Sequence, residues 1–444
     1  MKLSFPHPII ILLGFILLAG LSGYFIQSGS FERVLDVETG REIIVPGSFR
    51  PIEDKNASIY EVVLSIPEGF ILGADIVALI LLIGGAFYVV EKTGALQVGI
   101  EALIYRFRNK QFLLLYLIGI VFAFCGSTMA MQEEIIALTP VLVILAKKIN
   151  YNIRSIIAIS LGSSLVGASF SPFNPFGSLL SQSIAELNFE EGFAYRLLFL
   201  VLAIVIWCSY HIKYGKQKVE DSETHAMKPA KISFQHGVIL ILTFGGVGVM
   251  AWGVIYQDWG YNEMSALFFV VGISCGLIGK LGLNGTAKAY TEGFGEMIFA
   301  GIIVGLARCV YLVLQNTAII DPIIQGMFEP LEHMPAQFAA LGLYLSQAII
   351  HIPVPSTSGQ AVLTTPLAVP LMDLLGISRQ VAVLTYQYAA GLMDLVTPTN
   401  GGMMAVIAAA GIKYDDWIAY LWKSWLLLMV LGLISVFIAL FWFA

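Results

Sequence analysis

The chain has 444 residues, of which 58% are apolar and only 12% are charged, and its formal net charge is -6. A soluble domain carries about a quarter charged residues, so this composition cannot cover a water-facing surface. Lipid must therefore surround most of the exterior, which excludes a soluble enzyme, a disordered protein and a nucleic-acid binder. The composition predicts an all-α polytopic membrane protein.

The predicted crossings begin with an apolar run at 8–27. It follows Lys2 as a signal peptide would, but no small-x-small cleavage site ends it, so we interpret it as a retained helix. The polar stretch 28–68 is predicted to form a small cap on the outer face. Counting the first run, we predict nine crossings: 8–27, 69–90, 153–186 with a polar break, 195–214, 236–256, 264–283, 297–314, 380–412 with another break, and 417–440.

Two further apolar stretches, 111–146 and 337–375, each consist of two arms around a polar tip. Each arm has about 15 residues and is too short to span a bilayer alone. Basic residues flank both ends of the first stretch, and acidic residues flank the second. Because cytoplasmic loops are rich in Lys and Arg, we predict re-entrant hairpins that enter from opposite sides of the inner membrane, with a cytoplasmic N-terminus and an outer C-terminus.

The same landmarks recur in the same order in both halves of the chain. Each half has a hairpin with a Ser-Thr tip, then an arginine, then a proline within a helix break. They are Ser127-Thr128, Arg154 and 171–177 in the first half, and Ser356-Thr357, Arg379 and 397–402 in the second. Because the halves run in opposite directions, we predict an inverted-repeat transporter fold with two re-entrant hairpins and two broken transmembrane helices.

This repeat divides the chain into parts with different expected roles. The predicted parts are 1–110, scaffold helices with the outer loop 28–68; 111–214, the first hairpin, broken helix and following span; 215–235, a cytoplasmic linker; 236–336, a second scaffold part; and 337–444, the second hairpin, broken helix and last span. The first and second hairpin parts form the predicted transport unit, with a binding site at mid-depth between them.

Unwound backbone in a membrane must be buried in protein or line a wet cavity. The half-helix that starts at a break offers free NH groups to a carboxylate, and the carbonyls of the other half suit Na⁺. Such residues also kink and pack helices, but their matched positions in both halves favour binding. The predicted substrate-binding residues are Ser127, Thr128, Asn174, Ser356, Thr357, Ser358, Thr399 and Asn400.

Acidic residues in apolar segments are costly and therefore indicate a function. They could bind Na⁺, carry a proton or pair with an ammonium group of the substrate. The predicted coupling-ion or proton site comprises Gly126, Glu133, Glu134, Ser171, Gly359, Asp394 and Thr397. Adjacent glutamates on a helix point about 100° apart, so only one of the two should face the site. No cofactor is expected apart from Na⁺ or H⁺.

Two other polar residues leave alternatives open. Arg308 lies in an apolar helix, where it could hold a substrate carboxylate or pair with Asp321 or Glu296. His351 follows the arm that precedes the second tip. A packed histidine is the more common case there, and a proton carrier is the alternative.

With these residues the chain resembles the YfcC-like branch of the C4-dicarboxylate anaerobic carrier family, within the ion transporter superfamily. The most specific motifs are 355–361, 374–380 and 398–401, and the first tip from Gly126 to Glu134 is similar to that family's pattern. The sequence departs from it at Tyr388–Gly391, where the family usually has Phe-Gly-Asp-Gly, and at Asp394, where Asn is expected. The resemblance implies a homodimeric, ion-coupled carrier that works as an elevator.

We therefore predict a secondary active transporter of a small carboxylate-bearing metabolite, either a C4-dicarboxylate or an amino acid, coupled to Na⁺ or H⁺. An intramembrane enzyme is less favoured because no nucleophile with a neighbouring base is visible in the sequence. A passive channel is less favoured because channels usually gain their symmetry from several subunits, whereas this chain carries its own repeat.

Overall fold

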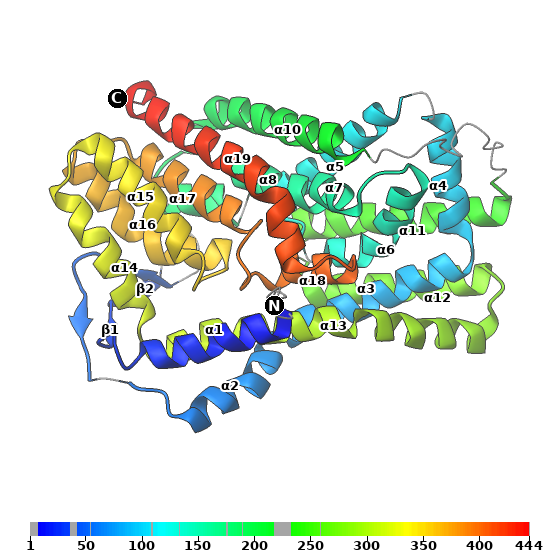
Figure 1. The fold of residues 1–444 in the computed structure, drawn as a ribbon, viewed down its shortest axis with the longest axis horizontal. Coiled ribbons are helices and arrows are strands. Elements are labelled where there is room, and N and C mark those ends of the chain that lie inside the picture. Colours follow the sequence, from blue (N-terminus) through cyan, green and yellow to red (C-terminus); the bar gives the residue numbers. More distant parts are fainter. Residues whose placement is uncertain are drawn as a thin grey trace, which may run out of the picture.

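The computed structural model describes residues 8–35, 42–53, 55–107, 110–132, 134–174, 176–188, 190–216, 232–257 and 259–443. Most of this part of the chain is helical (Figure 1). The first half contains α1 (Pro8–Ser22), α2 (Ile59–Leu72), α3 (Ala74–Lys92), α4 (Ala95–Arg106), α5 (Gln111–Met129), α6 (Glu134–Lys148), α7 (Ile153–Ile157), the π-helix η1 (Ala158–Gly162), α8 (Ser163–Phe170), α9 (Ser178–Ile184) and α10 (Phe193–Gly215).

The second half ends with a similar order of elements. It contains α11 (Phe234–Tyr256), α12 (Tyr261–Ile278), α13 (Gly282–Asn316), α14 (Ile320–Phe328), the 3₁₀ helix η3 (Glu329–His333), α15 (Ala336–Ile350), α16 (Thr357–Leu374), α17 (Arg379–Met393), α18 (Gly401–Ala409) and α19 (Tyr414–Trp442). In both halves, two adjacent helices are followed by a helix with a break and then by a long apolar helix. The order of landmarks predicted from the sequence is therefore found in the helices.

Seven helices in the described ranges are long and apolar enough to cross a membrane. Six of them fall on predicted crossings: α3, the continuous run α7–η1–α8, α10, α12, α13 and α19. The predicted crossing at 8–27 shortens to α1, and the one at 380–412 is divided between α17 and α18. The seventh helix is α5, which was predicted to be an arm too short to span.

The predicted tip of the first hairpin is wrong in its conformation. Gly126, Ser127 and Thr128 continue α5 as helix instead of unwinding. Thr128 Oγ1 donates back to the Phe124 carbonyl (2.9 Å), so its hydroxyl is satisfied within the helix. A Cβ at Gly126 would lie 1.9 Å from the Ser164 carbonyl oxygen. The small residue therefore permits close packing of α5 against α8, and the turn begins only at Ala130.

Side chains fix the starts of the helices that lead into the breaks and hairpins. Asn152 accepts a hydrogen bond from the Arg154 backbone at the start of α7, and Ser378 does so from Gln380 at the start of α17. Ser356 begins α16 in the same way, by accepting from Gly359. These caps satisfy backbone donors that would otherwise be costly in an apolar environment.

A proline lies within each break. Pro172 directly follows Ser171, the C-cap of α8, and cannot supply the backbone donor that a continuing helix needs, whereas Pro398 lies several residues beyond Met393, where α17 has already ended. Upstream of the first break, the π-helix η1 contains Ala158, whose carbonyl accepts a hydrogen bond from Trp207 Nε1 (2.7 Å). This contact joins α10 to the broken helix of the first half.

The packing between halves is reciprocal. Helix α9, after the first break, packs on α16 of the second hairpin, and α18, after the second break, packs on α6 of the first. The first parts of the two broken helices, α8 and α17, contact each other. In Figure 1, α14, α15 and α16 lie toward one end of the long axis, and α4, α11 and α12 lie toward the other.

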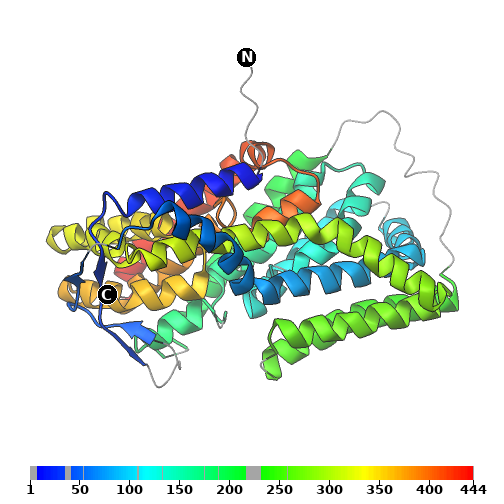
Figure 2. The same cartoon turned by 90° about the horizontal axis from the view of Figure 1, so that it is seen from below.

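The segment between α1 and α2 forms two antiparallel two-stranded sheets at the same end as α14–α16 (Figures 1 and 2). Its strands are β1 (Gly29–Ser30), β2 (Arg33–Leu35), β3 (Glu42–Ile44) and β4 (Arg50–Pro51). Asp321 of α14 is buried and accepts hydrogen bonds from the Phe31 backbone (2.9 Å) and from Arg33 (2.8 Å). The segment is thus fixed to the junction of α13 and α14.

Candidate functional site

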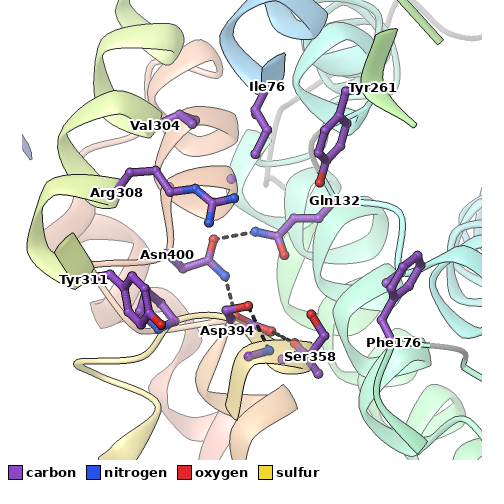
Figure 3. Close-up of a pocket in the computed structure, with 18 of the residues that line it drawn as sticks. Ile76, Gln132, Phe176, Tyr261, Val304, Arg308, Tyr311, Ser358, Asp394 and Asn400 are labelled. Carbon is purple, nitrogen blue, oxygen red and sulfur yellow. Dashed lines mark hydrogen bonds between the residues drawn. The ribbon is translucent and has the colours of Figure 1, made fainter. Parts of the chain in front are cut away.

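A polar cavity of about 610 Å³ lies where the second hairpin and the second break face α13 and the start of α6 (Figure 3). Its wall combines three groups of residues. They are Pro355–Gly359 of the hairpin turn with Asp394 and Thr399–Gly402 of the break; Val304, Ala307, Arg308 and Tyr311 of α13; and Ala130, Gln132, Glu134, Ile76, Phe176, Trp259, Gly260, Tyr261 and Met264 on the remaining sides. The cavity therefore lies between segments that are far apart in the sequence.

Asn400 organises the break side of the cavity. As the N-cap of α18, its Oδ1 accepts a hydrogen bond from the Met403 backbone (2.9 Å). This bond fixes which end of the amide is the oxygen, so Nδ2 points at Asp394 and donates to Oδ1 (2.5 Å). The helix start thus holds an amide donor against an acidic side chain at the cavity wall.

Asp394 also contacts a fully buried histidine. His351 Nε2 lies 2.8 Å from Asp394 Oδ1, and His351 Nδ1 lies 2.8 Å from Gln360 Oε1. The Nε2 of Gln360 donates to the backbone carbonyl of Gln347 (2.8 Å), so its oxygen must face the imidazole. Thr357 completes the set by donating to Asp394 Oδ2 (3.3 Å). Both hairpin arms therefore hold the acid of the break.

The first hairpin reaches the same network through Gln132. Its Nε2 donates to Asn400 Oδ1, and its backbone NH donates to Glu134 Oε2 (3.1 Å). Figure 3 shows Gln132 and Asn400 joined in this way above Asp394. The turn between α5 and α6 is thus in direct contact with the second break.

Three charged side chains line the described part of the cavity: Glu134, Asp394 and Arg308. Arg308 points toward Asn400 and Gln132 in Figure 3, and no acid among the described residues lies within ion-pair distance of it. The expected structural partner Asp321 pairs with Arg33 instead (2.8 Å), because the cap segment covers it. The guanidinium is therefore placed to receive an anionic group in the cavity.

The first break forms a closed set of contacts. Asn174 Nδ2 donates to the Gly126 carbonyl (2.9 Å), and Oδ1 accepts from the backbone of Phe176 and Gly177 (3.0 Å each). Ser171 Oγ donates to the Ser127 carbonyl (2.8 Å). Every polar atom of the Asn174 amide is therefore engaged with the backbone of its own half of the chain.

The predicted site residues divide into two groups in the structure. Those that line the cavity are Glu134, Ser356, Thr357, Ser358, Gly359, Asp394, Thr399 and Asn400. Those that lie away from its wall are Gly126, Ser127, Thr128, Ser171, Asn174 and Thr397; Glu133 lies outside the described residues. The predicted roles of both groups stay predictions. Most of the predicted site residues that line the cavity belong to the second half of the chain.

Sequence reasoning missed the contributions of Gln132, Tyr311 and Tyr261 to the cavity. Gln132 had a usable signal, since an uncharged polar residue directly precedes the two glutamates in an otherwise apolar stretch. The tyrosines had none, because apolar helices of membrane proteins contain many aromatic residues. In the described residues, no group of three or more His, Cys, Asp or Glu side chains could hold a metal ion.

Apolar helices of membrane-spanning length, together with a cavity that carries charged and amide side chains at the second break, are features of a helical membrane transport protein. Residues 5–441 match the family model of the C4-dicarboxylate anaerobic carriers, and the chain belongs to this family. The resemblance drawn from the sequence motifs is thereby confirmed, and the chain is a transporter and not an enzyme.

Two curated proteins are similar over most of the chain. A Haemophilus influenzae protein described as uncharacterized is 29% identical over 411 residues, which cover 88% of this chain and 80% of the relative. The putative basic amino acid antiporter YfcC of Escherichia coli is 29% identical over 369 residues, covering 77% of this chain and 73% of YfcC.

Two solved structures align over nearly the full length. They are the YdaH transporter of Alcanivorax borkumensis, with a TM-score of 0.45, 14% identity and 98% of each chain covered, and MtrF of Neisseria gonorrhoeae, with a TM-score of 0.44 and 16% identity, covering 99% of this chain and 96% of MtrF.

Proposed function

We propose that this protein is an ion-coupled secondary active transporter that carries an amino acid with a cationic side chain across the inner membrane. The observation that carries the proposal is the charge of the cavity wall. Arg308 offers one cation, whereas Glu134 and Asp394 offer two carboxylates. A basic amino acid has one carboxylate and two cationic groups, so it complements this wall group for group.

A C4-dicarboxylate fits the described wall less well. It carries two negative charges and would need a second cation, but Arg308 is the one Lys or Arg that lines the described part of the cavity. Binding such a substrate beside two carboxylates would also cost electrostatic repulsion. The name of the relative YfcC, a putative basic amino acid antiporter, agrees with the amino acid assignment.

The reciprocal packing supports the inverted repeat. Each helix that follows a break packs on the hairpin of the other half, as expected for two units related by a pseudo-twofold axis. The ion pairs support the membrane topology with a cytoplasmic N-terminus, since each joins residues that this topology places on one side. The pairs are Lys92–Glu292, Lys148–Glu101 and Arg154–Asp416 inside, and Arg33–Asp321, Arg379–Glu186 and Arg379–Asp373 outside.

The division of the apolar core supports an elevator mechanism with a hairpin-bearing unit. One core cluster joins parts of α3 and α4 to α11, α12 and the first part of α13, and a larger cluster contains both hairpins, both broken helices and the remaining buried residues of α3 and α4. The first cluster is our proposed scaffold, and the family resemblance leads us to place it in a homodimer. Re-entrant hairpins would then open the cavity to one side of the membrane at a time.

Purified protein in proteoliposomes tests the proposal directly. We expect liposomes preloaded with L-arginine to accumulate labelled L-arginine and L-lysine by exchange, while succinate and fumarate compete weakly. Arg308→Gln should raise the KM for L-arginine by about tenfold or more, because one charge-assisted contact is worth about 1.5–3 kcal/mol. Exchange of succinate without exchange of basic amino acids would refute the substrate assignment, and the absence of any exchange would refute the transport proposal.

A further inference from the structure

The contacts of His351 leave one mobile proton between two side chains. Gln360 presents its oxygen to Nδ1, so Nδ1 carries a hydrogen and Nε2 is the nitrogen that faces Asp394. At 2.8 Å between His351 Nε2 and Asp394 Oδ1, one proton must lie between them, on either partner. Imidazolium with carboxylate and imidazole with carboxylic acid contain the same number of protons, and both are neutral overall.

Removal of that proton would leave two acceptors facing each other. A neutral imidazole would direct its lone pair at a carboxylate, and the pair would carry one negative charge. His351 is completely buried and has no access of its own, whereas Asp394 borders the cavity. The proton can therefore leave only by way of Asp394 and the cavity, and a cation from the cavity can take its place at the carboxylate.

We infer that His351 and Asp394 form the coupling site of the transporter, where a proton and the ammonium group of the substrate compete for one carboxylate. A protonated pair is neutral and does not attract a cation. A deprotonated pair with a bound ammonium group is also neutral overall, so one proton released to the cavity accompanies each cationic group bound at Asp394. The inference rests on the proposed function and makes the transporter a proton-substrate antiporter.

The helices packed around His351 and Asp394 contribute the other polar and titratable groups near this pair. Helix α15 brings Gln347, and α16 brings Gln360 and Thr357, none of which titrates. Tyr386 of α17 donates to the Thr357 carbonyl. The remaining ionisable groups face the cavity: Glu134 of α6, Arg308 and Tyr311 of α13, and Tyr261 of α12. Within the described residues, His351 and Asp394 form the one pair among these groups in which a base is hydrogen-bonded to an acid.

The test compares His351→Gln with His211→Gln in sodium-free proteoliposomes. His211 is equally buried, but it lies in α10 and contacts Tyr420, away from the cavity. Wild type and His211→Gln should accumulate labelled L-arginine when the lumen is more acidic than the bath. His351→Gln should lose this accumulation by about tenfold or more, while the matched variant His211→Gln remains within about twofold of wild type.

A second measurement requires no variant and covers the case in which His351→Gln does not fold. Addition of L-arginine to wild-type protein in a weakly buffered detergent solution should release about one proton per molecule bound. Binding without proton release would overturn the inference, as would gradient-driven accumulation by His351→Gln or a strict need for Na⁺. Absence of L-arginine exchange by the wild type would refute the proposed function itself, and the coupling inference with it.

Discussion

Asn174 at the first break and Asn400 at the second stand at matched positions, and both accept backbone hydrogen bonds from the segment that follows. Their amide donors have different partners. Asn174 donates to the Gly126 carbonyl, which belongs to a helix, whereas Asn400 donates to Asp394 at the cavity wall. An asparagine therefore satisfies a backbone carbonyl at the first break and positions an ionisable side chain at the second. The two breaks are thus similar in architecture but different in chemistry.

The largest difference between the halves should come from the hairpin glycines. Gly126→Ala would place a Cβ 1.9 Å from the Ser164 carbonyl, which is backbone and cannot give way, so we expect a loss of about 3 kcal/mol or more. At Gly359 the nearest atom is the Ser356 Oγ, at 3.0 Å, and Gly359→Ala should change stability by less than about 1 kcal/mol. Thermal unfolding in detergent measures both, and equal losses would contradict the asymmetry.

The two asparagines give the next largest effect. Asn400→Ala removes a donor to a carboxylate, worth about 1.5–3 kcal/mol, so L-arginine binding should weaken by about tenfold to a hundredfold. Asn174→Ala should lower the unfolding temperature and leave the affinity of the folded protein unchanged. Calorimetric titration of the folded fraction separates the two results. A similar loss of affinity in both variants would instead support a site shared equally by the halves.

Gln132 should have a smaller effect, because its bond to Asn400 joins uncharged groups. Gln132→Ala should weaken L-arginine binding by about fivefold, corresponding to about 1 kcal/mol. The control is Ser171→Ala, which removes a bond of the first break to the Ser127 carbonyl and should change only stability. Unchanged binding in Gln132→Ala would show that the first hairpin supplies no support to the site.

The smallest effect concerns an ion pair at the proposed cytoplasmic face. The hydrogen bond from Lys148 lowers the pKa of Glu101, so this carboxylate stabilises the fold above its unfolded pKa and loses that contribution as pH falls through the lowered value. Both side chains are partly exposed, so Lys148→Gln should cost less than about 1 kcal/mol at pH 7. Unfolding temperatures of the variant and wild type should converge once the pH lies below the lowered pKa of Glu101. A difference that persists there would indicate a packing role for Lys148.

Much of the fold could be predicted because proline, charge and apolar length act locally. Pro172 stops α8 because it lacks a backbone donor, and runs of apolar residues form helices in lipid regardless of their neighbours. The tip at Gly126 could not be predicted, since glycine and serine suit both a loop and a close helix contact. Only the proximity of the Ser164 carbonyl decides between these interpretations.

The candidate site was harder to predict than the fold. Asp394 was recognisable as a costly acid in an apolar segment, but its contact with His351 joins residues 43 positions apart. That pairing depends on how α15 and the second break are placed along each other, which no local pattern encodes. The direction of the Arg308 side chain could not be predicted either. The sequence offers Asp321 as an ion-pair partner for Arg308, but in the structure Asp321 pairs with Arg33 of the cap segment.

The anchored cap has a practical consequence for following transport. Its contacts to Thr317, Ala318 and Asp321 bind residues 28–33 to the end of α13 and the start of α14. Strand β2 also pairs with β3, which contacts α16 of the second hairpin, so a fluorophore attached to the exposed side of β2 would travel with that hairpin. Paired with a second dye on the loop between α12 and α13, in the proposed scaffold, it would report the distance between two bodies during turnover.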